Sequence, residues 1–479
     1  MTSDRSDGKF GITDGGPRPL GRRFRYLWAT FVVASLGDGL GYGAVPLLAL
    51  FVDPHPLAVS GAAAADTFPW LVLALPAGAI ADRYERGRVM ALTNLARALV
   101  LAALALLVAT RRIDYALFVL LVFTNGGARA IYYSASQATV PELIEPDAFA
   151  RANGILSGTE AATEHLGGPI LGTLAFTASR ALPFAGDAAA VGIAGLSLFG
   201  LRTKRLRPTP THNSILDGAR QIVKDRSLRL LVTMLAALAG LQGLVMGVLV
   251  LTATADWSVP KNLYGLFLAV GNAGNVPGAL VADRIAKRIG NVPTLVASAF
   301  VSGLAYLAMA LARGWPLAAS AFFLVSFATC TGSVIAISLR LRLSPADLMG
   351  RVGSAWRGII WGTIPIGSLV GGFLAGVGGL RLPLFIAGVA QCVVAILLAG
   401  PLTHSIADSE RAAAVATRSK AFSGPALEGQ EVLGSSNSGQ AVAPAVPVDS
   451  PPMPAGRRLH SRPGHGPFYW GRSPRNGKH

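Results

Sequence analysis

Long apolar stretches, separated by short polar or basic connections, dominate the chain. A membrane-spanning helix needs about 20 mainly apolar residues. Windows of that kind lie at 26–51, 57–80, 89–110, 113–135, 153–178, 181–201, 228–253, 263–281, 292–311, 316–339, 352–377 and 382–402. The pattern therefore predicts an all-α integral membrane protein with about 12 transmembrane helices.

Two changes of character divide these windows into groups. Segment 202–227 is a basic and polar connection with six windows on either side of it. Beyond about residue 403 the chain is rich in Pro, Gly, Ser and charge and has no apolar period, which is typical of disorder. We expect a cytoplasmic N-terminal tail, a six-helix bundle, a cytoplasmic linker, a second six-helix bundle and a disordered cytoplasmic tail, at 1–25, 26–201, 202–227, 228–402 and 403–479.

The composition agrees with a bilayer as the solvent. Apolar residues make up 52% of the chain and charged residues 14%, whereas about 25% charged is usual in soluble domains. The net charge of +17 comes mainly from Lys and Arg in loops on the side of the two termini. The positive-inside rule then places both termini in the cytoplasm, and contact with anionic lipid explains the charge without nucleic acid. The Arg, Ala and Gly bias favours a bacterial cell membrane.

The two halves of the chain resemble each other at a shift of about 200 residues. Gly-Ala followed by Ala-Asp-Arg occurs in 78–83 and again in 278–284, and the Asp and Arg of 147–151 recur in 347–351. Two six-helix repeats of equal orientation are typical of a carrier whose halves rock about a central site.

The segment GAIADRYERGR at 78–88 resembles the loop motif of the major facilitator superfamily. LGDGLGYGAVPLLAL in the first window, ASQATVPELIEPDAFARANGILS before the fifth and LMGRVGSAW before the eleventh resemble the branch with bacterial enterobactin exporters and macrolide-efflux proteins. The resemblance covers about 25–402. It implies the major facilitator fold, two pseudo-symmetric six-helix bundles, and export of a small amphipathic solute (drug, siderophore or secondary metabolite) by alternating access.

The loop motif has expected roles as a gate. Gly78 permits close helix approach, and the resemblance implies that Asp82 faces the start of the eleventh span. Arg83, Arg86 and Arg88 would pair with acidic groups across the interface of the two halves and hold the cytoplasmic side closed. The alternative is that these arginines only set the topology.

Ionisable residues inside spans are costly, so they are candidates for coupling to protons. Asp38 lies near the middle of the first window, and Arg129, Glu160 and Glu164 lie in the fourth and fifth. Because Arg129 and Glu160 lie at similar depths, we expect them to form an ion pair and leave Glu164 to exchange a proton. The alternative is a static charge network that fixes helix packing. His165 projects away from Glu164.

The resemblance implies that spans 1, 4, 7 and 10 line the cavity and that Arg97 in span 3 lies at the periphery with a structural role. Arg357 and Trp361 in span 11 lie beside the cavity, where Arg357 either holds an anionic or aromatic solute or reaches the membrane surface. The remaining cavity candidates are polar or aromatic: Tyr42, Asn125, Tyr132, Gln242, Thr329 and Ser333. Such a lining suits an amphipathic solute.

The energy source is expected to be the proton gradient, since the sequence has no G-x-x-x-x-G-K-[ST] loop. The seven histidines are scattered, so we predict no metal, no cofactor and no enzymatic constellation. We expect a monomer with protons, a small solute and lipid as partners. Facilitated diffusion, uptake and a non-transporting sensor remain as alternatives.

Overall fold

The computed structural model describes residues 20–201, 215–345 and 348–422, and these are helical with no strand among them. Ten helices in this part of the chain are long and apolar enough to cross a membrane. Two predicted spans fall outside that group. The window 153–178 is interrupted by a π-helix, and the window 181–201 holds a helix of only 17 residues.

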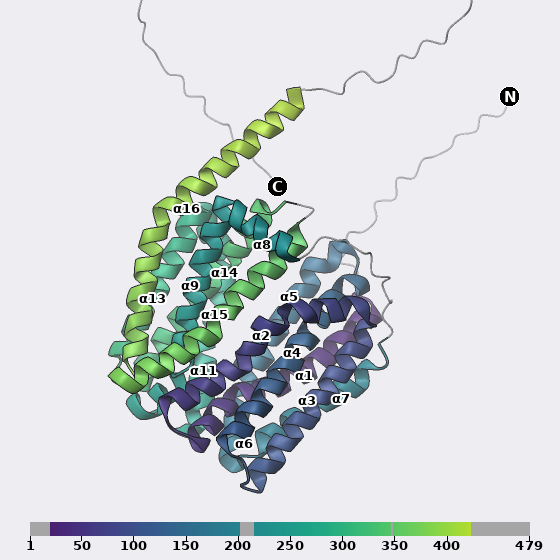
Figure 1. Cartoon of the computed structure of the whole chain (residues 1–479), viewed down its shortest axis with the longest axis vertical. Coiled ribbons are helices and arrows are strands. Elements are labelled where there is room, and N and C mark those ends of the chain that lie inside the picture. The colour runs from purple at the N-terminus through teal and green to yellow at the C-terminus, as the bar shows by residue number, and fades with distance from the viewer. Residues whose placement is uncertain (1–19, 202–214, 346–347, 423–479) are drawn as a thin grey trace, which may run out of the picture. The chain divides into compact units, whose positions relative to one another are not determined.

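The N-terminal half runs back and forth through the bundle (Figure 1), and a π-helix interrupts its fifth pass. Its elements are α1 (Arg22–Val52), α2 (Pro56–Arg83), α3 (Arg86–Ala109), α4 (Tyr115–Leu143), the 3₁₀ turn η1 (Pro146–Ala148), α5 (Phe149–Glu160), the π-helix η2 (Ala161–Gly167), α6 (Gly168–Ala178) and α7 (Leu182–Leu198).

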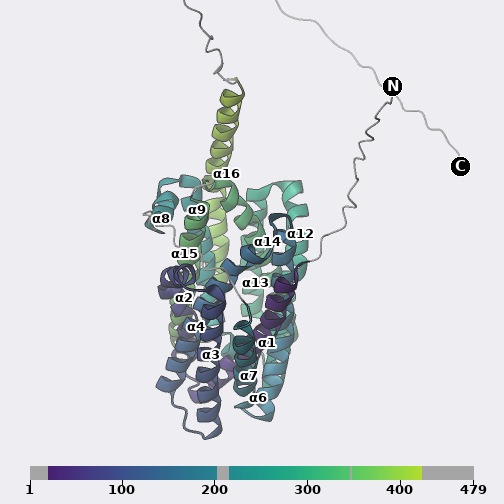
Figure 2. The same cartoon turned by 90° about the vertical axis from the view of Figure 1, so that its right-hand side faces the viewer.

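The C-terminal half repeats this path and lies beside the first half in Figure 1; Figure 2 views the molecule from the side of the N-terminal half. Its elements are α8 (Ile215–Lys224), α9 (Arg226–Met246), α10 (Leu249–Leu251), η3 (Thr252–Asp256), η4 (Lys261–Leu263), α11 (Tyr264–Asn272), α12 (Asn275–Ile289), α13 (Asn291–Leu311), α14 (Trp315–Leu343), α15 (Met349–Gly378) and α16 (Leu382–Phe422). Helix α8 lies inside the predicted linker 202–227, and α16 continues past residue 402. Of the predicted tails at 1–25 and 403–479, residues 1–19 and 423–479 lie outside the described residues, and 403–422 continue α16.

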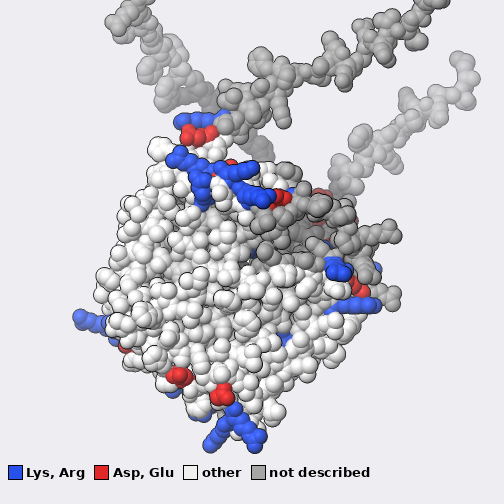
Figure 3. Space-filling view, in the orientation of Figure 1, with Lys and Arg blue, Asp and Glu red and all other residues white. Residues whose placement is uncertain are grey.

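The outer surface of the helices is apolar. Leu99 and Val377 are each 74% exposed, and many other large apolar side chains face outward. The visible face in Figure 3 has charged side chains toward its two ends and an almost uncharged zone between them. A surface of this kind matches a bilayer, where lipid tails replace water around the middle of each helix.

The two halves meet closely at the end of the bundle opposite the start of α1. There α2 packs on α15, and α6 packs on α11. Gly372 of α15 lies so near α2 that an added Cβ atom would sit 2.8 Å from the Pro56 carbonyl oxygen, and Gly265 of α11 lies directly against Pro169. Glycine at these two positions permits the backbone contact between the halves.

Candidate functional site

Two cavities adjoin each other at the boundary between the halves. The first, about 380 Å³, is lined from the N-terminal half, and we call it the acidic lobe. The second, about 370 Å³, is lined from the C-terminal half, and we call it the arginine lobe. Trp361 and Ile364 of α15 belong to the lining of both. Each lobe falls in the size range of sites for small molecules.

The acidic lobe is built around a buried charge network. Arg97 is fully buried and forms an ion pair with Asp38, and Arg129 forms an ion pair with Glu164. The Nε atom of Arg129 also lies 3.7 Å from the Asp38 carboxylate, and Arg97 donates from Nε to the Asn125 side-chain oxygen at 3.2 Å. The network therefore ties α1, α3, α4 and η2 together through opposite charges.

Glycines bring helix α1 close to its neighbours and so place Asp38. An added Cβ atom at Gly37 would lie 2.6 Å from the Asp187 carboxylate of α7. On another face of α1, an added Cβ atom at Gly43 would lie 2.6 Å from the Pro169 carbonyl oxygen. The glycines around Asp38 thus permit close packing on two sides of α1.

The predicted ion pair between Arg129 and Glu160 is wrong, because Arg129 pairs with Glu164. The backbone changes from α to π geometry directly after Glu160. The wider π turn alters the depth and direction of the residues that follow, so depth counted along a uniform α-helix is misleading here. Glu160 is the glutamate left without an ion pair among the described residues, and it lines the acidic lobe with Glu164.

The sequence-based prediction missed or misplaced three ionisable residues of this region. Arg97 lies inside the charge network and not at the periphery. Asp66 of α2 lines the acidic lobe. Asp187 of α7 is 2% exposed, and its Oδ1 atom has no hydrogen-bond partner in the described structure. The rule that intramembrane charges mark function applies equally to Asp66 and Asp187 and would have found both.

Aromatic rings separate the two lobes. Trp70 of α2 lies 4.7 Å from Trp361 of α15 and 5.4 Å from Tyr133 of α4, measured between ring centroids. Sequence reasoning found Trp361 but not its two partners. The predicted residues Tyr42 and Tyr132 line the acidic lobe, and so does His165, whose ring lies 5.6 Å from Tyr42. The predicted Asn125 is not part of that lining and instead accepts a hydrogen bond from Arg97.

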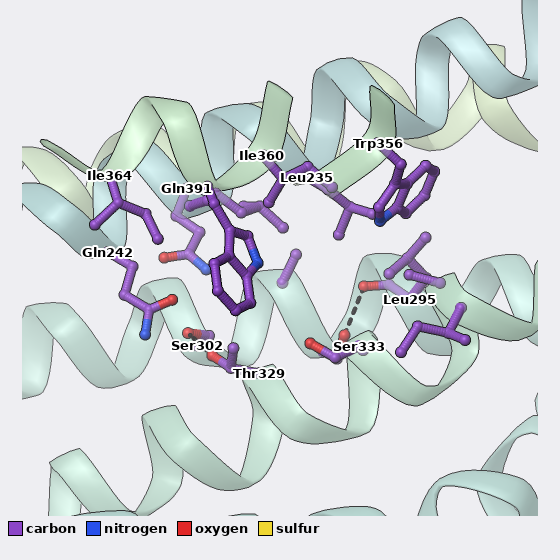
Figure 4. A pocket seen from close by; sticks show the side chains of 18 of the residues that line it. Leu235, Gln242, Leu295, Ser302, Thr329, Ser333, Trp356, Ile360, Ile364 and Gln391 are labelled. Atoms are coloured by element: carbon purple, nitrogen blue, oxygen red, sulfur yellow. Dashed lines mark hydrogen bonds between the residues drawn. The ribbon is translucent and has the colours of Figure 1, made fainter. Parts of the chain in front are cut away.

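The arginine lobe contains the predicted Gln242, Thr329, Ser333 and Arg357. It also contains Gln391, which sequence reasoning missed. Figure 4 shows Gln242, Gln391 and Thr329 gathered toward the side of the lobe near Ile364, with Trp356 at the other side. The remaining polar or charged members of the lining are Ser298, Ser302, Tyr306 and Arg340.

The predicted gate residues are only partly described. The surroundings of Gly78 and the side chain of Asp82 lie outside what the structure describes, and Arg83 is exposed. Arg86 forms an ion pair with Glu142 of α4, and Arg88 one with Glu85 at 2.9 Å. Both of these acidic partners belong to the N-terminal half, and pairing of the arginines across the interface of the halves stays a prediction.

These features define a class of protein: a multi-pass, all-helical membrane carrier with solute-sized cavities at the boundary between its two halves. The family model described as Major Facilitator Superfamily matches residues 27–362. The chain belongs to this superfamily of transporters and is not an enzyme. Within the described residues, no group of three or more His, Cys, Asp or Glu residues is arranged to hold a metal ion.

Two curated relatives and one solved structure are similar over most of the chain. The multidrug efflux pump Tap of Mycolicibacterium fortuitum is 25% identical over 380 residues, 75% of this chain and 92% of Tap. The uncharacterized MFS-type transporter YceJ of Bacillus subtilis (strain 168) is 24% identical over 336 residues, covering 69% and 84% of the two chains. An inward-facing, unoccupied bacterial homolog of the human lysosomal transporter Spinster has a TM-score of 0.62 at 12% identity, covering 81% and 99%.

Proposed function

We propose that this transporter exports a small amphipathic solute by alternating access and that protons entering the cell drive the export. The observation that carries the proposal is the set of four carboxylates in the wall of the acidic lobe, at the boundary between the halves. Carboxylates that are shielded from bulk water and face a solute cavity are typical of proton-coupled carriers. The similarity to the efflux pump Tap supports the outward direction.

The charge network divides the carboxylates into two kinds. Asp38 and Glu164 are neutralised by Arg97 and Arg129, so protonating either one leaves an arginine without its partner. Asp66 and Glu160 have no ion pair among the described residues. Because their protonation breaks no ion pair, we assign proton exchange first to Glu160 and Asp66. Asp38 and Glu164, through their ion pairs with the arginines, transmit this change in protonation to the helices.

The remaining parts of the proposal concern topology. We place the protein in the bacterial cell membrane as a monomer, with both termini in the cytoplasm, because Lys and Arg gather on that side. With this orientation the contacts of Gly265 and Gly372 between the halves lie toward the outside of the cell. The cavity would then be closed on the outer side. We propose that the loop motif with Gly78, Asp82, Arg83, Arg86 and Arg88 closes the cytoplasmic side in the alternate state.

Proton movement in inside-out vesicles tests the proposal. Vesicles that contain the transporter are energised, amphipathic compounds are added, and a pH-sensitive dye reports proton release. We expect release that disappears in Glu160→Gln and persists in Asp283→Asn, whose carboxylate belongs to an exposed pair with Lys287. Solute flux without proton release would contradict proton coupling and favour a facilitator. Solute binding without any flux would contradict transport and favour a sensor.

A further inference from the structure

The two lobes of the cavity differ in charge. At the acidic lobe, Asp38 forms an ion pair with Arg97 and Glu164 forms one with Arg129, so the two charges within each pair cancel. Asp66 and Glu160 remain as carboxyl groups with no ion pair among the described residues. The acidic lobe therefore has two carboxyl groups that can face a cationic group of a ligand.

The arginine lobe has the opposite imbalance. Arg340 and Arg357 both line it, and its lining includes no acidic side chain among the residues that the structure describes. The guanidinium carbon of Arg340 lies 5.6 Å from the centre of the Trp356 ring, which holds the side chain along the lobe wall. Arg340 is partly buried and Arg357 is exposed, so two guanidinium groups without an acidic partner face the same lobe and attract an anion that enters it.

A polar group in the same lobe also lacks a partner. Gln391 is 4% exposed, lines the arginine lobe, and has an Oε1 atom with no hydrogen bond in the described structure. Because this oxygen lies beside the cavity, it can accept a hydrogen bond from an N–H or O–H group on the body of a ligand. Gln242 supplies a second amide near it (Figure 4).

An aromatic boundary lies between the two lobes. Trp361 belongs to both linings and contacts Trp70 and Tyr133. Aromatic faces attract organic ammonium groups and also pack against apolar or aromatic bodies. A ligand that passes Trp361 meets carboxylates on one side and guanidinium groups on the other.

We propose that the cavity takes an elongated zwitterionic solute whose ammonium group lies in the acidic lobe, whose aromatic or apolar body lies against Trp361, and whose carboxylate lies in the arginine lobe. The proposal names the substrate class of the transport function proposed above. Neither lobe alone recognises this chemistry. The opposite charges of the lobes also orient the solute, because the reversed orientation places each charged end beside groups of its own sign.

A matched series of three compounds tests the proposal. The zwitterion is a fluorescent aryl-piperazine carboxylic acid, its methyl ester keeps only the positive charge, and its N-acetyl derivative keeps only the negative charge. Equilibrium binding is measured by fluorescence anisotropy on the full chain in detergent micelles free of phospholipid, so that lipid phosphate cannot occupy the arginine lobe. We expect each charge removed to weaken binding on the order of tenfold.

Two double variants assign each charge to its lobe. Arg340→Gln with Arg357→Gln should bind the zwitterion and the methyl ester equally, while the N-acetyl compound loses affinity. Asp66→Asn with Glu160→Gln should bind the zwitterion and the N-acetyl compound equally. Arg313→Gln, at an exposed residue between α13 and α14, is the control and should keep the full preference. Elution as a single species and an unchanged unfolding temperature establish that each variant is folded.

The outcomes separate this proposal from the transport function. Equal affinity of the wild-type protein for the three compounds, including no binding by any of them, would overturn it. So would variants that weaken all three compounds to the same extent. Binding at equilibrium needs neither a gradient nor flux. The charge preference can therefore hold when the vesicle experiment shows no proton release, and the vesicle experiment can succeed when the charge preference fails.

Discussion

Removing both charges of the pair Asp38–Arg97 should destabilise the fold less than the sum of the two single removals. Arg97 is fully buried and Asp38 nearly so. Breaking a buried ion pair costs about 3–5 kcal/mol, because one charge is left without compensation. In Arg97→Gln, Asp38 keeps only Arg129 at 3.7 Å, and in Asp38→Asn the guanidinium of Arg97 keeps only the amide oxygens of Asn94 and Asn125.

The double variant carries no buried charge at this position. We therefore expect its free energy of unfolding to recover about 2–3 kcal/mol relative to the sum of the two single effects, within the range measured for directly contacting residues. Equilibrium unfolding in mixed detergent micelles, followed by tryptophan fluorescence, measures all four proteins of the cycle.

A control cycle uses the exposed pair Asp283–Lys287, whose side chains are 70% and 75% exposed. Its coupling should stay below about 1 kcal/mol, as is usual for surface pairs. Additive effects at Asp38 and Arg97, within about 0.5 kcal/mol, would refute the reasoning and show that water or another group compensates each charge.

Two further substitutions follow from the packing of the N-terminal half. Gly43→Val should lower the free energy of unfolding by about 1–3 kcal/mol, since its side chain would overlap the Pro169 carbonyl. Gly376→Val is the control, because an added Cβ atom there meets nothing within 4 Å. Equal effects of the two substitutions on unfolding in detergent would contradict the reasoning. Asp187→Asn should not lower the unfolding temperature measured by tryptophan fluorescence. The Oδ1 atom of this buried carboxylate has no hydrogen-bond partner in the described structure, so its charge does not stabilise the fold. A clearly lower unfolding temperature would show that Asp187 has a charged partner.

The positions of most spans could be predicted from apolar length alone. The window 57–80 corresponds to α2, and the window 292–311 corresponds to α13. This works because the bilayer requires a minimum apolar length and satisfied backbone hydrogen bonds, and both constraints act locally. Helix α8 was missed because a helix within a polar connection does not produce an apolar window of that length.

The charge network could be predicted only in part. Hydropathy does not encode the hydrogen-bond register of the backbone, so the π-helix η2 and the choice of Glu164 over Glu160 could not be found that way. Arg97 was misplaced because its helix was assigned by resemblance to the periphery, although its long side chain reaches Asp38 from α3. Asp66 and Asp187 needed only the same rule that selected Asp38.

The position of Trp361 links solute recognition to movement between the halves. Trp361 lies on α15, one helical turn after Arg357, and faces Trp70 of α2 in the other half. A ligand shifts a conformational equilibrium only when its affinity differs between the states. A zwitterion that spans the boundary contacts both halves, so its affinity changes whenever α15 moves relative to α2. The methyl ester contacts charged groups of one half only. At saturating concentrations of each compound, the zwitterion should therefore evoke more proton release in vesicles than the methyl ester. Equal release with the two compounds would contradict this link.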